Sequence, residues 1–284
     1  MEERQIMEGN PPKAKPAKDR IEQMSFLDHL EELRWRIIKG SIGIVVGIVI
    51  AFIFSDFLVN TVLLGPTKAD FVVYKWLGID AVDLTLQSRK LPGQFFAYWG
   101  TMFVMGVIIG IPLFIYQLWG FVEPAFDSSG KWRTKGNTLF ITFFFLLGVS
   151  FGYFVLVPFA LQFFSQFQMA ETADIIRNDF DINAYFSSVT MWILSCGVIF
   201  QLPVVSYFLS KFGLITPEFL KKYRRHSLVG CFAISAILTP PDPVSQILVA
   251  VPLIILFQLS IYVSKLGVRS REKSLKKAFG EDEA

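Results

Sequence analysis

The 284-residue chain has little charge and little of the chemistry that enzymes use. Only 18% of its residues are Asp, Glu, Lys or Arg, whereas 53% are hydrophobic and 30 are Phe. A soluble domain of this length carries more charge, so the composition favours a membrane protein. The two cysteines, Cys196 and Cys231, lie within apolar runs. We therefore expect buried core thiols, and neither a disulfide framework nor a thiolate metal site.

Other absences narrow the class of function. The two histidines, His29 and His226, have no cluster of His, Cys and Asp residues near them, and no Gly-rich phosphate loop is present. We expect no enzyme activity, no metal, no cofactor and no nucleic-acid partner. The absence of an internal repeat argues against transporters built from duplicated halves. The polar first 39 residues lack an apolar core, so we expect no cleavable signal.

Uncharged stretches predict an all-α protein with six transmembrane helices. Most exceed the ~20 residues that a ~30 Å hydrocarbon core requires. The fifth stretch is about 22 Å long at ~1.5 Å per residue, so it must begin upstream near Tyr223 or the bilayer must thin locally. The stretches cover residues 40–55, 95–122, 136–170, 182–210, 227–241 and 243–264.

Basic residues between these stretches predict the orientation. Of the 27 Lys and Arg residues, 22 fall on the side of the two termini and five on the other. The positive-inside rule then places both termini in the cytoplasm. We expect a disordered segment at 1–24, a membrane domain at 25–266 and a charged, mobile tail at 267–284. The outer loop at about 56–94 could form short strands or an interfacial helix.

The segment before the first span has an amphipathic pattern. Ser25 can cap a helix, and an apolar stripe including Phe26 and Leu30 follows at helical spacing. Glu32 and Arg36 lie on the opposite face with Arg34 beside them. The pattern predicts a helix at the interface that turns into the membrane, either as a plain anchor or as a ligand-binding surface.

A second group of acidic residues follows the second span. Glu123 comes directly after the uncharged helix and before Pro124, and Asp127 is nearby. A carboxylate at a helix C-terminus is unfavourable for the helix dipole, so Glu123 is either a solvated helix end or a binding residue. With Glu32, these acids could bind paired guanidinium groups. Arg34, Arg36 and Lys131 complete this candidate site.

Polar residues within the spans are the next candidates. Gln201 precedes Pro203 in the fourth span, and Gln258 lies in the sixth. Such amides either hold the bundle together or contact a partner. Tyr153 in the third span joins this group. Pro240, Asp242 and Gln246 belong to a rigid turn that we expect on the outer face.

Together these motifs resemble the TatC family, the multispanning subunit of the twin-arginine protein translocase. The matching runs keep the order and spacing of the spans. The last of these runs is the most specific to the family. They are 29–36, 116–124, Ser150-Phe151 with Tyr153 and Pro158, 200–203, Arg224-Arg225, and the Thr-Pro-Pro-Asp-x-x-Ser-Gln sequence at 239–246.

The resemblance implies an inner-membrane receptor for twin-arginine signal peptides. It would work with TatA- and TatB-like single-span partners, as an oligomer in the lipid bilayer, to move folded proteins using the proton motive force. Gly130 stands where the family has a key carboxylate, and Gln201 and Gln258 replace family glutamates. The alternatives are a secondary transporter, which needs ionisable residues at the midplane, and a scaffold without a ligand.

Overall fold

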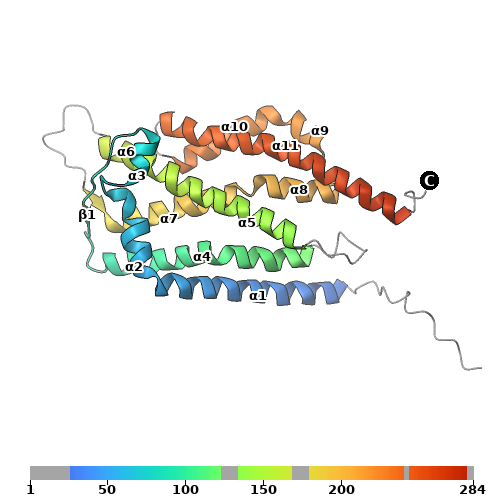
Figure 1. Ribbon diagram of the computed structural model, residues 1–284, viewed down its shortest axis with the longest axis horizontal. Coiled ribbons are helices and arrows are strands. Elements are labelled where there is room, and N and C mark those ends of the chain that lie inside the picture. Colours follow the sequence, from blue (N-terminus) through green and yellow to red (C-terminus); the bar gives the residue numbers. More distant parts are fainter. Residues whose placement is uncertain (1–25, 123–133, 168–178, 240–242, 280–284) are drawn as a thin grey trace, which may run out of the picture.

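The structure, a computed structural model, describes residues 26–122, 134–167, 179–239 and 243–279. Within these ranges it is a bundle of long helices that run lengthwise past one another (Figure 1). We call the end where α1 begins and α11 ends the termini end. The opposite end, which carries α2, α3 and β1, is the loop end (Figure 1). The predicted all-helical class agrees with this architecture.

Within the described ranges, five helical stretches are long and apolar enough to cross a membrane: Leu30–Ile53, Gly93–Phe121, Thr138–Gln166, Ile182–Phe212 and Gln246–Glu272. They are formed by α1 (Phe26–Ile53), α4 (Gly93–Val122), α5 (Thr134–Phe151) with a π-helix (Gly152–Leu156) and α6 (Val157–Gln166), α7 (Ile182–Ile199) with α8 (Leu202–Phe212), and α11 (Pro243–Phe279). The remaining apolar run is α10 (Arg224–Leu238), which has 15 residues. It begins next to Tyr223, the upstream start that the sequence suggested.

Glycines allow α1 and α4 to pack with their backbones in close contact. A Cβ on Gly47 would lie 2.3 Å from the carbonyl oxygen of Gly106, and one on Gly106 would lie 2.4 Å from Cα of Ile48. Gly110 meets Ile44 in the same way. Small residues at such spacing are the usual means by which membrane helices approach closely. This seam fixes the start of α1 against the end of α4.

The sequence predicted a turn between an interfacial segment and the first span, and this prediction is wrong. α1 runs unbroken from Phe26 to Ile53 for 28 residues. Leu30 and Ile37 of the predicted apolar stripe are exposed, whereas the side chains of Glu32 and Arg36 are about three-quarters buried. The polar residues continue the glycine face toward α4, so it is the charged side of this segment that packs against the protein. Ser25, the expected cap, lies outside the described residues.

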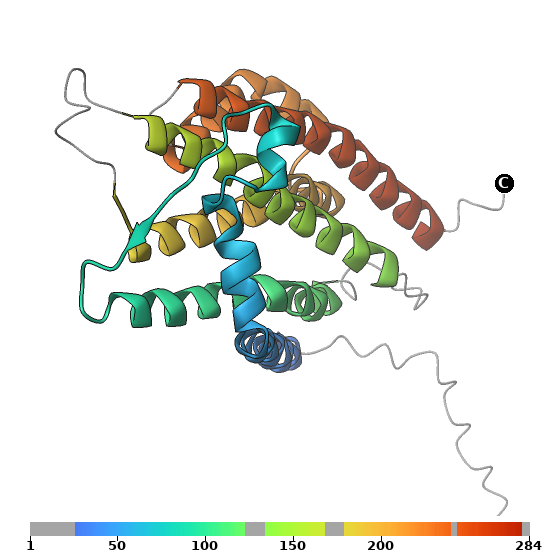
Figure 2. The same ribbon diagram turned by 60° about the vertical axis from the view of Figure 1, so that its left-hand side comes forward.

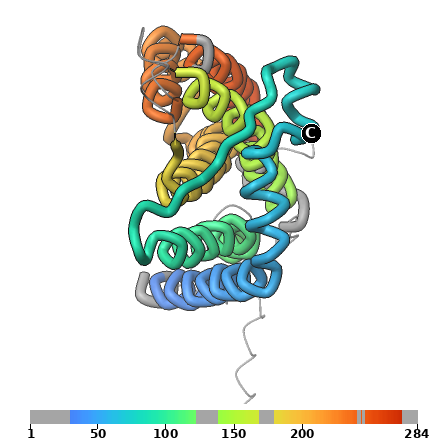
Figure 3. Tube along the Cα trace, turned by 90° about the vertical axis from the view of Figure 1, so that its left-hand side faces the viewer, coloured from blue at the N-terminus to red at the C-terminus, as the bar shows by residue number. Residues whose placement is uncertain are grey.

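The segment between α1 and α4 crosses the loop end of the bundle (Figure 3). It contains both kinds of structure that the sequence left open: α2 (Ser55–Phe57), a π-helix (Leu58–Leu63), a 3-10 turn (Gly65–Thr67), α3 (Val72–Leu77) and β1 (Leu86–Gln87). β1 pairs in parallel with β2 (Phe180–Asp181), just before α7 (Figure 2). Asp181 then caps α7 by accepting from the backbone N–H groups of Asn183 and Ala184. These hydrogen bonds, led by that of Ala184, lower the pKa of the Asp181 carboxyl.

Two hydrophobic clusters fill the bundle. One lies among α1, α4, α5, α6, α7 and the loop-end segment, and the other among α4, α5, α7, α8, α10 and α11. Cys196 and Cys231 are buried and free in the second cluster, as predicted for core thiols. α11 continues to Phe279, so the first part of the predicted tail is helical.

Candidate functional site

An ion pair on α1 is the first element of the candidate site at the termini end. Arg36 Nε donates to Glu32 Oε1 at 2.8 Å, and Nη2 lies 2.7 Å from the same oxygen. The two residues are one helical turn apart, the spacing at which such pairs form. Oε2 of Glu32 has no partner among the described residues, so it can accept a hydrogen bond from a ligand.

The Arg36 guanidinium occupies a space on α4 that exists because residue 120 is glycine. A Cβ at Gly120 would lie 2.2 Å from Nη1 of Arg36. α4 therefore fixes the position of Arg36, and Arg36 in turn fixes the carboxylate of Glu32. A planar guanidinium held on a helix surface orients a carboxylate better than a flexible ammonium group would.

Trp119, beside Gly120, adds a buried hydrogen-bond donor. Its side chain is 4% exposed, and its ring packs on Phe208 of α8 with centroids 3.8 Å apart. The indole Nε1 is buried with no hydrogen-bond partner among the described residues. An indole nitrogen only donates, and leaving it unpaired costs free energy. Trp119 belongs to the motif at 116–124, but the sequence did not predict that its indole N–H would be buried without a hydrogen-bond partner.

Of the remaining predicted binding residues, the structure describes Arg34 alone. Arg34 is exposed, and its position two residues from both Glu32 and Arg36 places it on the side of α1 turned away from α4. Glu123, Asp127 and Lys131 lie outside the described residues, in the segment that follows α4. α4 ends at Val122, two residues beyond Gly120. The structure therefore fixes Glu32 and leaves the predicted acidic patch otherwise as a prediction.

Gln201 lies at a break between α7 and α8. Pro203 is at the first turn of α8, and the break allows Gln201 Nε2 to donate to the carbonyl of Ile141 on α5 at 3.2 Å. Phe200 stacks on Phe151 with ring centroids 5.4 Å apart. Oε1 of Gln201 is buried and unpartnered among the described residues. The amide thus joins α5 to the break between α7 and α8 through its nitrogen, while its oxygen is buried without a partner among the described residues.

Gln258 has the opposite environment. It lies in the apolar part of α11 and is exposed, as are its neighbours Ile255 and Tyr262. No hydrogen bond joins Gln258 to another described residue. A primary amide that faces lipid without a partner is costly, so this surface of α11 is a candidate for contact with another helix.

Tyr153 is one of three tyrosines that hold the loop end. Its hydroxyl donates to the carbonyl of Val62 at 2.8 Å, and that of Tyr185 donates to Leu63 at 2.6 Å. The hydroxyl of Tyr74 donates to the carbonyl of Pro66. Burial raises the pKa of Tyr74, which keeps that hydroxyl protonated as a donor. Tyr153 therefore contacts its own chain, and sequence reasoning missed the roles of Tyr74 and Tyr185.

The turn between α10 and α11 is described in part. Gln246 Nε2 donates to the carbonyl of Phe232 at 3.4 Å and so joins the two helices. Thr239 Oγ1 donates to the carbonyl of Ser235 at 2.8 Å at the end of α10. Pro240 and Asp242 lie outside the described residues. The described part of the turn has a structural role.

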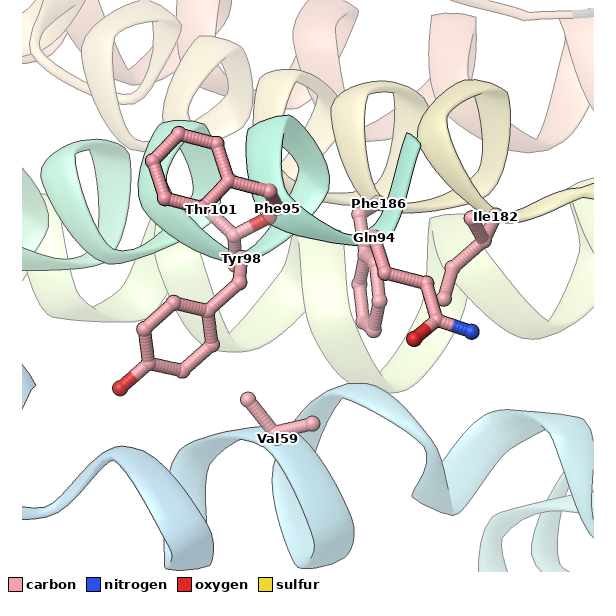
Figure 4. A pocket seen from close by; sticks show the side chains of 7 residues that line it. All are labelled: Val59, Gln94, Phe95, Tyr98, Thr101, Ile182 and Phe186. Atoms are coloured by element: carbon pink, nitrogen blue, oxygen red, sulfur yellow. The ribbon is translucent and has the colours of Figure 1, made fainter. Parts of the chain in front are cut away.

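A pocket of about 360 Å³ lies at the loop end between the π-helix Leu58–Leu63, α4 and α7 (Figure 4). It is lined by Val59, Gln94, Phe95, Tyr98, Thr101, Ile182 and Phe186. Its walls are mostly apolar, and the described residues contain no group of His, Cys, Asp or Glu side chains that could hold a metal. The pocket therefore offers a surface for apolar groups.

Comparison with known proteins decides the family. The profile of the family "Sec-independent protein translocase protein (TatC)" matches residues 28–252. The chain belongs to the TatC family. The Sec-independent protein translocase protein TatC of Blattabacterium sp. subsp. Periplaneta americana is 35% identical over 87% of this chain and 97% of its own length. TatCy of Bacillus subtilis is 31% identical over 90% of this chain and 94% of its own.

Solved structures agree with this assignment. A crystal structure of the twin-arginine translocase receptor TatC matches with a TM-score of 0.65 at 30% identity and covers 84% of this chain and 99% of its own. A second one, of TatC in the detergent DDM, matches with a TM-score of 0.66 at 33% identity, over 83% of this chain and 99% of its own. This TatC-family chain is therefore a membrane component of a protein translocase and a transport protein.

Proposed function

We propose that this chain is the receptor subunit of a twin-arginine translocation system in a bacterial cytoplasmic membrane. It binds twin-arginine signal peptides and, with TatA- and TatB-like partners, moves folded proteins using the proton motive force. The observation that carries the proposal is Glu32: a partly buried carboxylate, oriented by Arg36 on Gly120, with one oxygen free. Anionic headgroups would repel such a carboxylate, whereas a guanidinium can bind it bidentately.

The proposed binding step uses groups at the start of α1 and the end of α4. One arginine of the signal peptide donates to Oε2 of Glu32, beside the guanidinium of Arg36. The acids that follow α4, Glu123 and Asp127, receive the second. A small-solute transporter would instead need ionisable residues at the midplane, and the described parts of the second and third spans contain no charged residue.

The test of this function is selective peptide binding by the purified full-length chain. A labelled signal peptide with two arginines should bind with micromolar or better affinity in fluorescence anisotropy. Replacing both arginines by lysines removes the planar fork and should weaken binding at least tenfold, or about 1.4 kcal/mol. Equal affinity for the two peptides would refute recognition of paired guanidinium groups.

The proposed topology has six spans, counting α10, with both termini in the cytoplasm. In intact cells a membrane-impermeant maleimide should label Asp80→Cys, which lies at the loop end. It should not label Gly130→Cys or Leu275→Cys, which lie with the basic residues. The native Cys196 and Cys231 are buried and supply little background. Labelling of position 130 from outside would reverse the orientation.

We propose that Gln201 serves by hydrogen bonding to a partner helix or signal peptide; because its Oε1 is buried within this chain, that contact requires the helices around it to move apart. Gln201→Leu should insert normally but show a partial export defect, because membrane hydrogen bonds contribute about 0.6–2 kcal/mol. Gln201→Glu keeps an acceptor oxygen and should retain substantial export, since an amide transfers no proton at this position. The measurement is the export rate of a twin-arginine substrate at matched levels of protein. A wild-type rate for Gln201→Leu would contradict the proposed contact.

A further inference from the structure

A basic-aromatic patch lies at the termini end, where α9 (Pro217–Lys222) meets the start of α10 (Figure 1). We define it as Phe219, Lys221, Lys222, Tyr223, Arg224 and Arg225. Its four cations fall within five residues and are all exposed. No ion pair joins any of them to a described residue, and Glu218 is the one acid between residues 211 and 226. The patch is therefore a concentrated positive surface without a protein counterion in the described part of the chain.

The aromatic residues of the patch also face outward. Phe219 and Tyr223 are 50% and 41% exposed, and their rings pack together with centroids 4.6 Å apart. Tyr223 also lies against His226, with ring centroids 5.7 Å apart. Exposed aromatic rings beside lysines and arginines are typical of the boundary between hydrocarbon and headgroups.

The positive charges of Arg224 and Arg225 do not stabilise α10, the helix that these residues begin. Arg224 and Arg225 occupy the first turn of α10, where the helix dipole is positive and cations are unfavourable. No side chain caps that end of the helix. Two cations placed against the dipole, with two more on α9, point to an anion supplied from outside the chain.

The length of α10, which spans the membrane in the proposed topology, favours a lipid headgroup as that anion. Fifteen residues span about 22 Å, some 8 Å less than the hydrocarbon thickness of an average bilayer. A short span is accommodated by local thinning of the bilayer and by basic residues that reach the headgroups. The patch is at the end of α10 where such an anchor is needed.

We propose that the basic-aromatic patch binds the phosphate headgroups of anionic phospholipids in the leaflet at the termini end, and thereby fixes the depth of α10. The rings of Phe219 and Tyr223 lie at the acyl boundary, and the four cations contact phosphate oxygens. This site is separate from Glu32 and does not depend on peptide binding.

The experiment is native mass spectrometry of the purified full-length chain in a neutral detergent, with phosphatidylglycerol or phosphatidylcholine added. The wild-type chain should retain phosphatidylglycerol at least fivefold better than phosphatidylcholine. Each surface cation contributes up to about a fivefold preference for anionic lipid, so Lys221→Gln/Lys222→Gln should lower the preference severalfold and leave the share of the two arginines. Arg224→Lys/Arg225→Lys keeps the charge and should keep the preference. The matched control is Lys68→Gln/Lys75→Gln, two exposed cations at the loop end.

Three results would overturn the proposal. They are equal retention of the two lipids by the wild-type chain, an unchanged preference in Lys221→Gln/Lys222→Gln, and an equal loss in the Lys68→Gln/Lys75→Gln control. Millimolar inorganic phosphate should not displace phosphatidylglycerol, because it lacks the acyl chains that the aromatic rings contact. Complete displacement would show a site for free anions and not for lipid.

Discussion

Glu32→Lys should weaken binding of a twin-arginine peptide by about 2–4 kcal/mol, or roughly thirty- to a thousandfold. The substitution removes a charge-assisted contact and puts a cation next to Arg36, where the peptide arginine must enter. Glu32→Gln keeps the shape of the side chain and removes only the charge, so its loss should be smaller, about 1.5–3 kcal/mol. Fluorescence anisotropy with the purified variants gives both values.

The control for this result is the neighbouring carboxylate. Glu31→Gln removes the same charge from the same helical turn, but Glu31 is exposed, and no hydrogen bond or ion pair joins it to Arg36 or to another described residue. The affinity of the Glu31→Gln variant for the twin-arginine peptide should stay within about twofold of the wild-type value, as expected for a screened surface charge. Equal losses for Glu31→Gln and Glu32→Gln would mean that overall negative charge, and not an oriented carboxylate, attracts the peptide.

Gly106→Ala should destabilise the protein by about 2–3 kcal/mol. The added Cβ would lie 2.4 Å from Cα of Ile48, and backbone cannot move aside as a flexible side chain can. α1 and α4 would have to separate, and the contact between Arg36 and Gly120 would loosen with them. Chemical unfolding in mild detergent, followed by circular dichroism, measures the change in the free energy of unfolding.

Gly100 supplies the matched control on the same helix. A Cβ there meets nothing within 4 Å. Gly100→Ala should leave stability unchanged or raise it by about 0.5–1 kcal/mol, the usual gain for alanine over glycine in a helix. If the two variants unfolded alike, the close approach of α1 and α4 would not be a source of stability.

The main features of the fold could be predicted from sequence because lipid imposes simple rules. Long uncharged runs must be helices, and five of the six predicted runs form helices long enough to cross a membrane. The shortness of the fifth run also followed from residue counting, and a start near Tyr223 was one of the two alternatives that the count left open. The break at Gln201 could be anticipated from Pro203, since proline frees a carbonyl and ends the helix hydrogen-bond pattern.

Features that depend on which face meets which helix could not be predicted. The amphipathic pattern before the first span suggested that Glu32 and Arg36 face water, and the structure turns them toward α4. The deciding residue is Gly120, more than eighty positions away, whose missing Cβ makes room for a guanidinium. The loop-end hydrogen bonds of Tyr74 and Tyr185 likewise join segments that no local pattern connects.

Site-specific crosslinking of a bound signal peptide tests the central claim most directly. A photoreactive residue at Leu33 or Phe121, beside Glu32 and the end of α4, should capture a twin-arginine peptide on the purified full-length chain. The same probe at Val59, at the loop end, should capture none of its arginine region. Capture at Leu33 and Phe121 that disappears with a twin-lysine peptide is the result that we predict. Equal capture of both peptides, or capture of the arginine region at Val59, would contradict a receptor site at the termini end.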